Sequence, residues 1–125
     1  MAGNLRFGRR IRELREAKKR TDPTFSLRQF AQALNMSATF ISKVETGEFN
    51  PPSAENIKKM AELLEVDPYE LLQLAEKADP ELVEMVKAQP KEMADFLRTA
   101  RESGITSEQF AQFTRTLQSR KGRKS

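Results

Sequence analysis

The chain has 125 residues with no Cys and no His, and its formal net charge is +4. The missing residue types exclude disulfides, thiolate and imidazole metal sites, Cys or Ser–His nucleophiles and histidine acid–base chemistry. No apolar run is long enough for a membrane span or a signal peptide, so we expect a cytoplasmic, nucleoid-associated protein that is bacterial, archaeal or phage-encoded, with no cofactor and no metal.

The charge is unevenly distributed along the chain. The net charge is +5 over residues 1–50, −6 over residues 51–97 and +5 over residues 98–125. Basic ends around an acidic middle favour contact of the ends with phosphate groups. For the C-terminal segment, a role in solubility alone is an equally good interpretation.

The first predicted helix covers residues 5–19, where apolar residues recur at helical spacing. Gly8 weakens its first turn. The next segment, residues 20–24, is a loop that Pro23 interrupts.

A second helix is predicted from Ser26 to residue 34. Ser26 is a good N-cap, and Gln29 three residues later completes a capping box. Phe25 and Phe30 are spaced as a hydrophobic staple, which fixes the angle at which the chain enters the helix.

A third short helix begins after Ser37 and ends at Gly47, a residue that commonly follows a helix C-terminus. Two consecutive prolines then make a rigid connection to a fourth helix, which Ser53 caps and which runs to residue 64.

Start signals for further helices follow at regular intervals. Asp67-Pro68 and Asp79-Pro80 each combine a capping residue with proline at the first helical position, and Gln89-Pro90 is a weaker version. Gly104 separates that helix from a last one over residues 106–120. We find no strand signal, so the predicted class is all-α.

The two short helices over residues 26–34 and 37–46 have the spacing of a helix-turn-helix. In that motif the second helix enters the DNA major groove and reads base edges. Two capped helices also occur in ordinary helical bundles, so spacing alone leaves both interpretations open.

The outward side chains of the second helix are small or form hydrogen bonds, as base-edge contact requires. They are Ala38, Thr39, Ser42 and Lys43. Ile41 and Val44 are expected to face the core. Phe40 either joins them or lays its ring against the DNA backbone.

Several runs resemble the lambda repressor/Cro-like (XRE) family of helix-turn-helix regulators. They are IRELR at residues 11–15, FSLRQFA at 25–31, MSATFISKVETG at 36–47, NPPS at 50–53 and MAELLEVDPYELL at 60–72. The resemblance covers about residues 5–75 and implies a five-helix DNA-binding domain over residues 1–77 that binds double-stranded DNA.

The resemblance also implies roles for single residues. Ala31 is the small residue where the two helices approach, and Arg15 and Glu45 form a partly buried ion pair. In the loop of residues 48–50, backbone amides and Asn50 contact phosphate. The complete set of expected DNA-backbone contacts, from the resemblance and from the helix faces together, is Ser26, Arg28, Ser37, Phe40, Phe49 and Asn50.

Three departures from the family pattern concern the DNA backbone. Leu27 stands where many members have Gln, so one anchor is lost or moved to Arg28. The loop over residues 18–24 is long, and its basic residues either contact the backbone or face solvent. Glu48 places a negative charge near phosphate, which opposes binding.

Residues 78–120 lie outside the resemblance and are interpreted as a helical oligomerisation region, followed by a flexible basic tail over residues 121–125. Apolar stripes on short helices need a partner surface. We expect a dimer interface made by Phe96, Leu97, Phe110, Phe113 and Leu117. Packing of these residues within the chain is the alternative.

The function predicted from these features is a homodimeric transcriptional repressor that binds a palindromic operator. The alternative is a helix-turn-helix antitoxin, or another module that binds a regulatory protein partner and uses DNA binding for autoregulation. An enzyme is not expected, because no catalytic motif is present.

Overall fold

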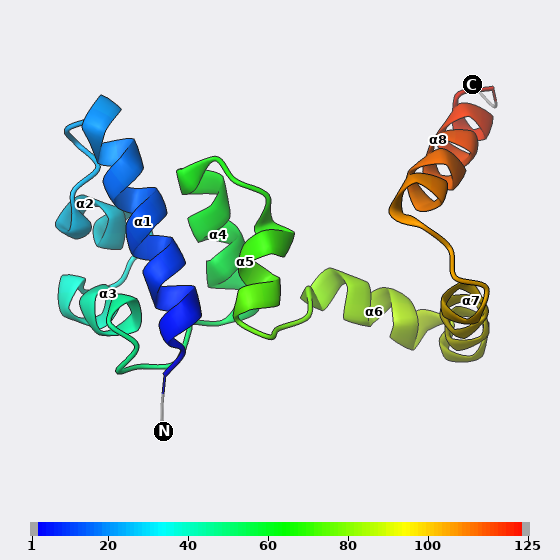
Figure 1. Ribbon diagram of the computed structural model, residues 1–125, viewed down its shortest axis with the longest axis horizontal. Helices are drawn as coiled ribbons and strands as arrows, with labels where there is room; N and C mark the ends of the chain where they lie inside the picture. Colours follow the sequence, from blue (N-terminus) through cyan, green and yellow to red (C-terminus); the bar gives the residue numbers. More distant parts are fainter. Residues whose placement is uncertain (1–2, 124–125) are drawn as a thin grey trace. The chain divides into compact units, whose positions relative to one another are not determined.

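The computed structural model describes residues 3–123 and, within them, consists of helices with no strand (Figure 1). The helices are α1 (Leu5–Thr21), α2 (Leu27–Ala33), α3 (Ala38–Glu45), α4 (Ala54–Leu64), α5 (Pro68–Leu74), α6 (Pro80–Ala88), α7 (Pro90–Glu102) and α8 (Ser107–Arg123). The predicted all-α class is confirmed. Each predicted helix is present, with ends within one turn of the expected positions.

The chain forms two compact units, the first ending at Val83 and the second beginning at Glu84. The first unit extends past residue 77, because side chains of α4 and α5 bind the buried carboxylate of Asp79. Lys58 Nζ donates to Asp79 Oδ1 at 3.1 Å and Tyr69 Oη donates to Asp79 Oδ2 at 3.4 Å. Helix α8 continues to Arg123, so the expected tail begins inside it, and residues 124 and 125 lie outside the described residues.

The helix starts follow the local signals. Ser26, Ser37, Ser53 and Asp67 each accept a hydrogen bond from an amide in the first turn of the helix that follows. The capping box of Ser26 with Gln29 is complete, and the rings of Phe25 and Phe30 pack with centroids 5.5 Å apart. These interactions fix the start of α2, as the sequence predicted.

Helices α1 to α5 share one hydrophobic core. Its buried members are Phe7, Ile11, Phe30, Ala31, Leu34, Ile41, Val44, Ile57, Met60, Ala61, Leu64, Leu71, Leu72 and Ala75. Both short helices of the predicted helix-turn-helix contribute to this core through one face. Their opposite faces are therefore left for contacts outside the domain.

Gly8 has a packing role that its helix propensity did not reveal. A Cβ atom at this position would collide with the carbonyl oxygens of Val44 and Glu45, the latter at 2.6 Å. Gly8 therefore allows the backbone of α1 to lie directly against the C-terminal end of α3, and its unfavourable helix propensity is the cost of this approach.

The second unit has little core of its own. Of its described side chains, Ala100 is the buried one. Large apolar side chains on α7 and α8 are instead exposed, among them Phe96, Leu97, Phe110, Phe113 and Leu117. The apolar stripes predicted for this region are thus not covered within the unit.

Candidate nucleic-acid interface

A tight turn joins α2 to α3. Asn35 takes a left-handed conformation with φ +59°, and the Met36 amide donates to the Ala31 carbonyl at 2.9 Å. Ala31 is buried where the two helices meet, and a larger side chain there would push them apart. The turn and this small residue set the angle at which α3 is presented.

One face of α3 is anchored and the other is open. Ile41 and Val44 are completely buried, as expected for the core-facing side. On the opposite side Thr39 is exposed, and the remaining candidate base-contacting residues, Ala38, Ser42 and Lys43, are partly exposed. These four residues lie on one accessible surface of a short helix, which is the arrangement that reading of a DNA groove requires.

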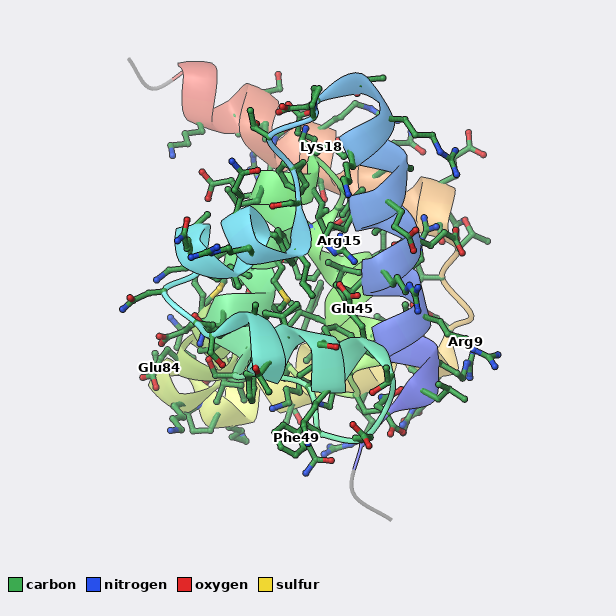
Figure 2. The ribbon with its side chains drawn as sticks, turned by 90° about the vertical axis from the view of Figure 1, so that its left-hand side faces the viewer. Arg9, Arg15, Lys18, Glu45, Phe49 and Glu84 are labelled. Atoms are coloured by element: carbon green, nitrogen blue, oxygen red, sulfur yellow. The ribbon has the colours of Figure 1, made fainter. Side chains whose placement is uncertain are left out.

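A buried ion pair fixes α3 to α1. Arg15 Nε donates to Glu45 Oε2 at 2.8 Å and Arg15 Nη2 donates to Glu45 Oε1 at 3.0 Å, with the two side chains only 8% and 4% exposed. Figure 2 shows the two side chains pointing toward one another between the helices. The hydrogen bonds to Glu45 raise the pKa of Arg15 more than burial lowers it. The predicted ion pair is confirmed.

Phe40 is neither fully inside the core nor free of it. Its ring is half-buried and packs against Phe49, with centroids 5.9 Å apart, while the Phe49 ring is 42% exposed. Lys43 Nζ lies 5.2 Å from the centroid of the Phe49 ring, within the range of a cation–π contact. The three side chains form one cluster at the end of α3.

The loop after α3 is closed by its own backbone. The amides of Glu48 and Phe49 both donate to the Lys43 carbonyl, at 2.9 and 3.1 Å. The expectation that these amides contact phosphate is therefore not supported, because they already have an acceptor. Asn50 Oδ1 accepts from the Gly3 amide at 2.8 Å, which leaves Asn50 Nδ2 as the side-chain donor of this loop.

The start of α2 carries the other expected backbone contacts. Ser26 Oγ is engaged with Gln29, whereas the Arg28 side chain is exposed and Leu27 is half-buried. Ser37 is exposed at the start of α3 and its Oγ accepts from the Phe40 amide at 3.0 Å. Arg28 is thus the charged residue among the predicted DNA-backbone contacts at the start of α2.

The expectation that Lys18, Lys19 and Arg20 belong to a long loop is wrong, because α1 continues to Thr21 and the three residues lie in its last turn. Lys18 Nζ donates to Glu65, the residue directly after α4, at 2.8 Å and lies 5.4 Å from the Phe25 ring centroid, so this lysine holds α1 to its neighbours. Asn4, which sequence reasoning missed, caps α1 and also donates to the Leu74 carbonyl at 2.7 Å. An Asn directly before a predicted helix is the signal that would have identified this cap.

Two further observations concern the described residues. No helix among them is long and apolar enough to cross a membrane. No three of their acidic side chains come close enough together to hold a metal ion.

A family model described as a helix-turn-helix domain matches residues 6–74, which cover α1 to α5 except for Leu5. The chain belongs to this helix-turn-helix family. The predicted resemblance to helix-turn-helix regulators is therefore confirmed, and the matched segment contains α3 and the ion pair that holds it.

Curated relatives from Bacillus subtilis are named as regulators. The chain is 42% identical over 69 residues to the HTH-type transcriptional regulator RghRB, a match of 55% of this chain and 45% of that protein. It is 41% identical over 64 residues to the HTH-type transcriptional repressor RghR, covering 51% and 43%. It thus spans less than half the length of these two relatives.

A third relative matches over more of the chain. The HTH-type transcriptional regulator SlrR, also from Bacillus subtilis, is 30% identical over 111 residues, covering 89% of this chain and 67% of that protein. Among solved structures, a complex of the SinR and SinI proteins aligns with a TM-score of 0.46 and 24% identity over 93% of this chain and 98% of that chain.

Proposed function

We propose that this chain is a sequence-specific transcriptional repressor that binds a palindromic operator as a homodimer, with α3 in the major groove. The observation that carries the proposal is the presentation of α3. Its inner face is fixed by the core and by the Arg15–Glu45 pair, while Thr39 and its neighbours remain accessible. A rigid short helix with a free polar face is what base readout needs. Membership of the helix-turn-helix family and the regulator names of the relatives support it.

The proposed base contacts are Ala38, Thr39, Ser42 and Lys43, and the proposed backbone contacts are Ser26, Arg28, Ser37, Phe40, Phe49 and Asn50. Thr39 and Ser42 offer hydroxyl groups, and Lys43 offers a positive charge to guanine or phosphate. In the free protein the Phe49 ring holds the Lys43 ammonium near the end of α3. Lys43 is therefore positioned before DNA arrives.

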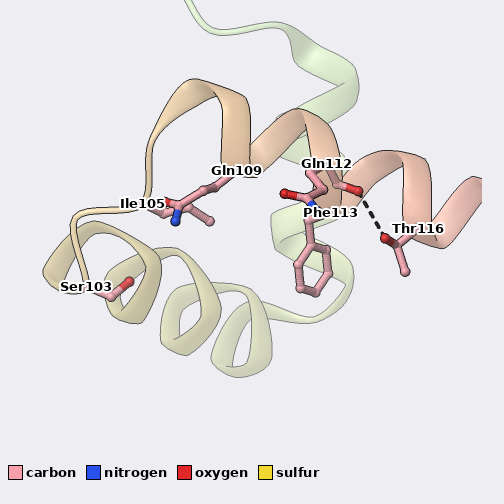
Figure 3. Close-up of a pocket in the computed structure, with 6 residues that line it drawn as sticks. All are labelled: Ser103, Ile105, Gln109, Gln112, Phe113 and Thr116. Atoms are coloured by element: carbon pink, nitrogen blue, oxygen red, sulfur yellow. Dashed lines mark hydrogen bonds between the residues drawn. The ribbon is translucent and has the colours of Figure 1, made fainter.

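The proposed dimer forms through α7 and α8. Between these helices lies an apolar groove of about 570 Å³, lined by residues that include Phe96, Ala100, Ile105, Phe110, Phe113 and Leu117. Figure 3 shows the adjoining side of α8, where a second groove of about 490 Å³ has the polar lining of Gln109, Gln112 and Thr116 beside Phe113. The ring of Phe113 thus lies at the border between an apolar and a polar surface.

A second copy of the chain is the occupant that fits the apolar groove. Two half-sites of a palindrome require two copies of α3, and a twofold interface uses the same patch on both copies. The exposed apolar side chains supply both the groove and the groups to fill it: Phe96, Leu97, Phe110, Phe113 and Leu117 are each between 44% and 53% exposed.

DNA binding is tested by selecting preferred sequences from random duplexes with the purified chain. We expect two inverted half-sites with centres about 10 base pairs, or a multiple of this, apart. Thr39→Ala and Lys43→Ala should change the selected bases while the melting temperature stays constant, whereas Lys59→Ala at an exposed position of α4 should leave the selection unchanged. A chain that binds all duplexes equally would contradict the proposal.

Dimerisation is tested by sedimentation. Phe113→Asp should give monomers with intact helix content, because a charge in an apolar interface is costly. Gln118→Asp is the matched control, since it places the same charge on α8 at an exposed position outside both grooves. A chain that is monomeric before any substitution, and binds DNA only with a second protein, would overturn the dimer and favour the partner-binding alternative.

A further inference from the structure

A second positively charged surface lies beside the helix-turn-helix and is not part of the base-reading face. The second half of α1 and the start of α2 enclose a groove of about 540 Å³. Its lining consists of Arg12, Arg15, Glu16, Lys19, Arg20 and Leu27. We call this surface the α1–α2 groove.

The cations of the α1–α2 groove differ in whether they form an ion pair with a carboxylate. Arg15 is neutralised by Glu45, and Arg12 Nε donates to Glu16 Oε1 at 2.8 Å. Lys19 and Arg20 are exposed, and neither forms an ion pair within residues 3–123. The Glu16 carboxylate lines the same groove, and its pKa is lowered first by the hydrogen bond from Arg12 and also by the nearby charges of Arg15 and Arg20. The groove keeps a net positive charge, because its four cations outnumber the carboxylates of Glu16 and Glu45.

The groove lies where the DNA strand is expected to pass. Arg15 lines it and at the same time holds Glu45, the last residue of α3 (Figure 2). The groove therefore adjoins the C-terminal end of the reading helix. Leu27 places it at the start of α2. In a helix-turn-helix the first of the two helices crosses the sugar-phosphate backbone while the second is in the major groove.

Leu27 itself has no hydrogen-bond donor in its side chain. Leu27 therefore adds no polar group to the groove, and a phosphate there would have to be held by the cations of the lining. Lys19 and Arg20 line the same groove, and neither is engaged in an ion pair within residues 3–123. Arg12 adds a guanidinium group that can turn from Glu16 to a phosphate at little cost, since the pair is an exposed one.

We infer that the α1–α2 groove binds a phosphate of the DNA backbone through Lys19 and Arg20, with Arg12 as a third cation. The inference rests on the proposed function, because it places this phosphate next to the half-site that α3 reads. The contact is to phosphate alone and adds affinity without adding base preference.

The test compares the full-length double variant Lys19→Gln/Arg20→Gln with the wild type on the selected operator. The salt dependence of binding should lose about one unit of slope for each lost phosphate contact. For one contact, the ratio of affinities between about 50 and about 200 mM salt shrinks by about 3.5-fold. The selected base sequence should stay the same.

Two further variants serve as controls. Lys59→Gln/Lys77→Gln removes the same charge from exposed positions of the same unit outside the groove, and should leave the slope nearly unchanged. Lys19→Arg/Arg20→Lys keeps both charges and should bind like the wild type. Thermal unfolding of every variant separates loss of binding from loss of folding.

The outcomes distinguish this inference from the proposed function. A wild-type chain that selects a sequence, with a groove variant of equal affinity and slope, overturns the inference and leaves the proposed function standing. An equal loss in both double Gln variants shows a nonspecific charge effect and also overturns it. Inorganic phosphate that perturbs groove amide signals, with DNA binding unchanged by the groove variant, assigns the groove to a free anion instead. A wild-type chain without sequence preference overturns both.

Discussion

For Gly8→Ala, helix propensity predicts a gain in the free energy of unfolding, whereas packing predicts a loss. Alanine is the better helix former, so an exposed Gly→Ala change inside a helix stabilises by about 1 kcal/mol. At Gly8 the added Cβ would overlap the carbonyl oxygens of Val44 and Glu45. Both are backbone atoms of α3, so neither can rotate away as a flexible side chain would.

The cost of this overlap exceeds the gain in propensity. Overpacking by a single carbon typically costs about 1–3 kcal/mol, and more where backbone has to move. Separating α1 from α3 also lengthens the Arg15–Glu45 hydrogen bonds, which are now 2.8 and 3.0 Å. We therefore expect a net destabilisation of about 2 kcal/mol, equivalent to a fall in melting temperature of about 8–16 °C for a domain of this size.

The measurement is thermal unfolding followed by circular dichroism, with Ala17→Gly as the control. Ala17 lies on an exposed position of α1, so this change should cost only the propensity difference of about 1 kcal/mol. The Gly8→Ala variant should also bind operator DNA more weakly well below its melting temperature, because α3 is displaced. A higher melting temperature for Gly8→Ala than for the wild type would refute the packing argument.

Three other substitutions test separate contacts. Arg15→Ala leaves the Glu45 carboxylate buried without a partner and should cost about 3–5 kcal/mol, whereas the double change Arg15→Met/Glu45→Leu should recover most of it in denaturant unfolding. The pKa of Asp79 is lowered, first by the hydrogen bond from the Glu81 amide and then by Lys58. Its carboxylate therefore stabilises the fold above the unfolded-state pKa, and this stabilisation is lost as pH falls below about 4. The melting temperature of Asp79→Asn should lie below that of the wild type at neutral pH and converge with it in acid. Asn50→Asp keeps the acceptor for the Gly3 amide but replaces the Nδ2 donor by a negative charge, so DNA affinity should fall in a titration while the melting temperature holds.

Local signals made the helices predictable. A capping residue and the amide it accepts from are two or three positions apart, so the Ser26–Gln29 box and the Asp67-Pro68 start are visible in the sequence. The core faces of α3 and α4 follow from helical spacing in the same way. Such features require no knowledge of the rest of the chain.

Contacts between distant segments were predictable only through the family resemblance, or not at all. The Arg15–Glu45 pair, 30 positions apart, was expected from the resemblance and is present. Gly8 was interpreted as a weak point because its neighbour, the backbone of α3, is invisible to a local reading. The burial of Asp79 likewise depends on α4 and α5, which the start signal Asp79-Pro80 does not reveal.

The candidate DNA contacts on α3 can be tested without unfolding the domain, because their side chains contribute little to the bonds that hold the helix and the loop after it. The loop is closed by amides that donate to the Lys43 carbonyl, a bond that any side chain at this position preserves. The Lys43 side chain contributes only its contact with the Phe49 ring, and Thr39 is exposed. The core residues Ile41 and Val44, the backbone bonds and the Arg15–Glu45 pair thus carry the stability of this region, and the exposed side chains are left for the proposed base contacts. If truncation of the Thr39 or Lys43 side chain lowered the melting temperature as much as loss of Arg15, this separation of folding from recognition would not hold.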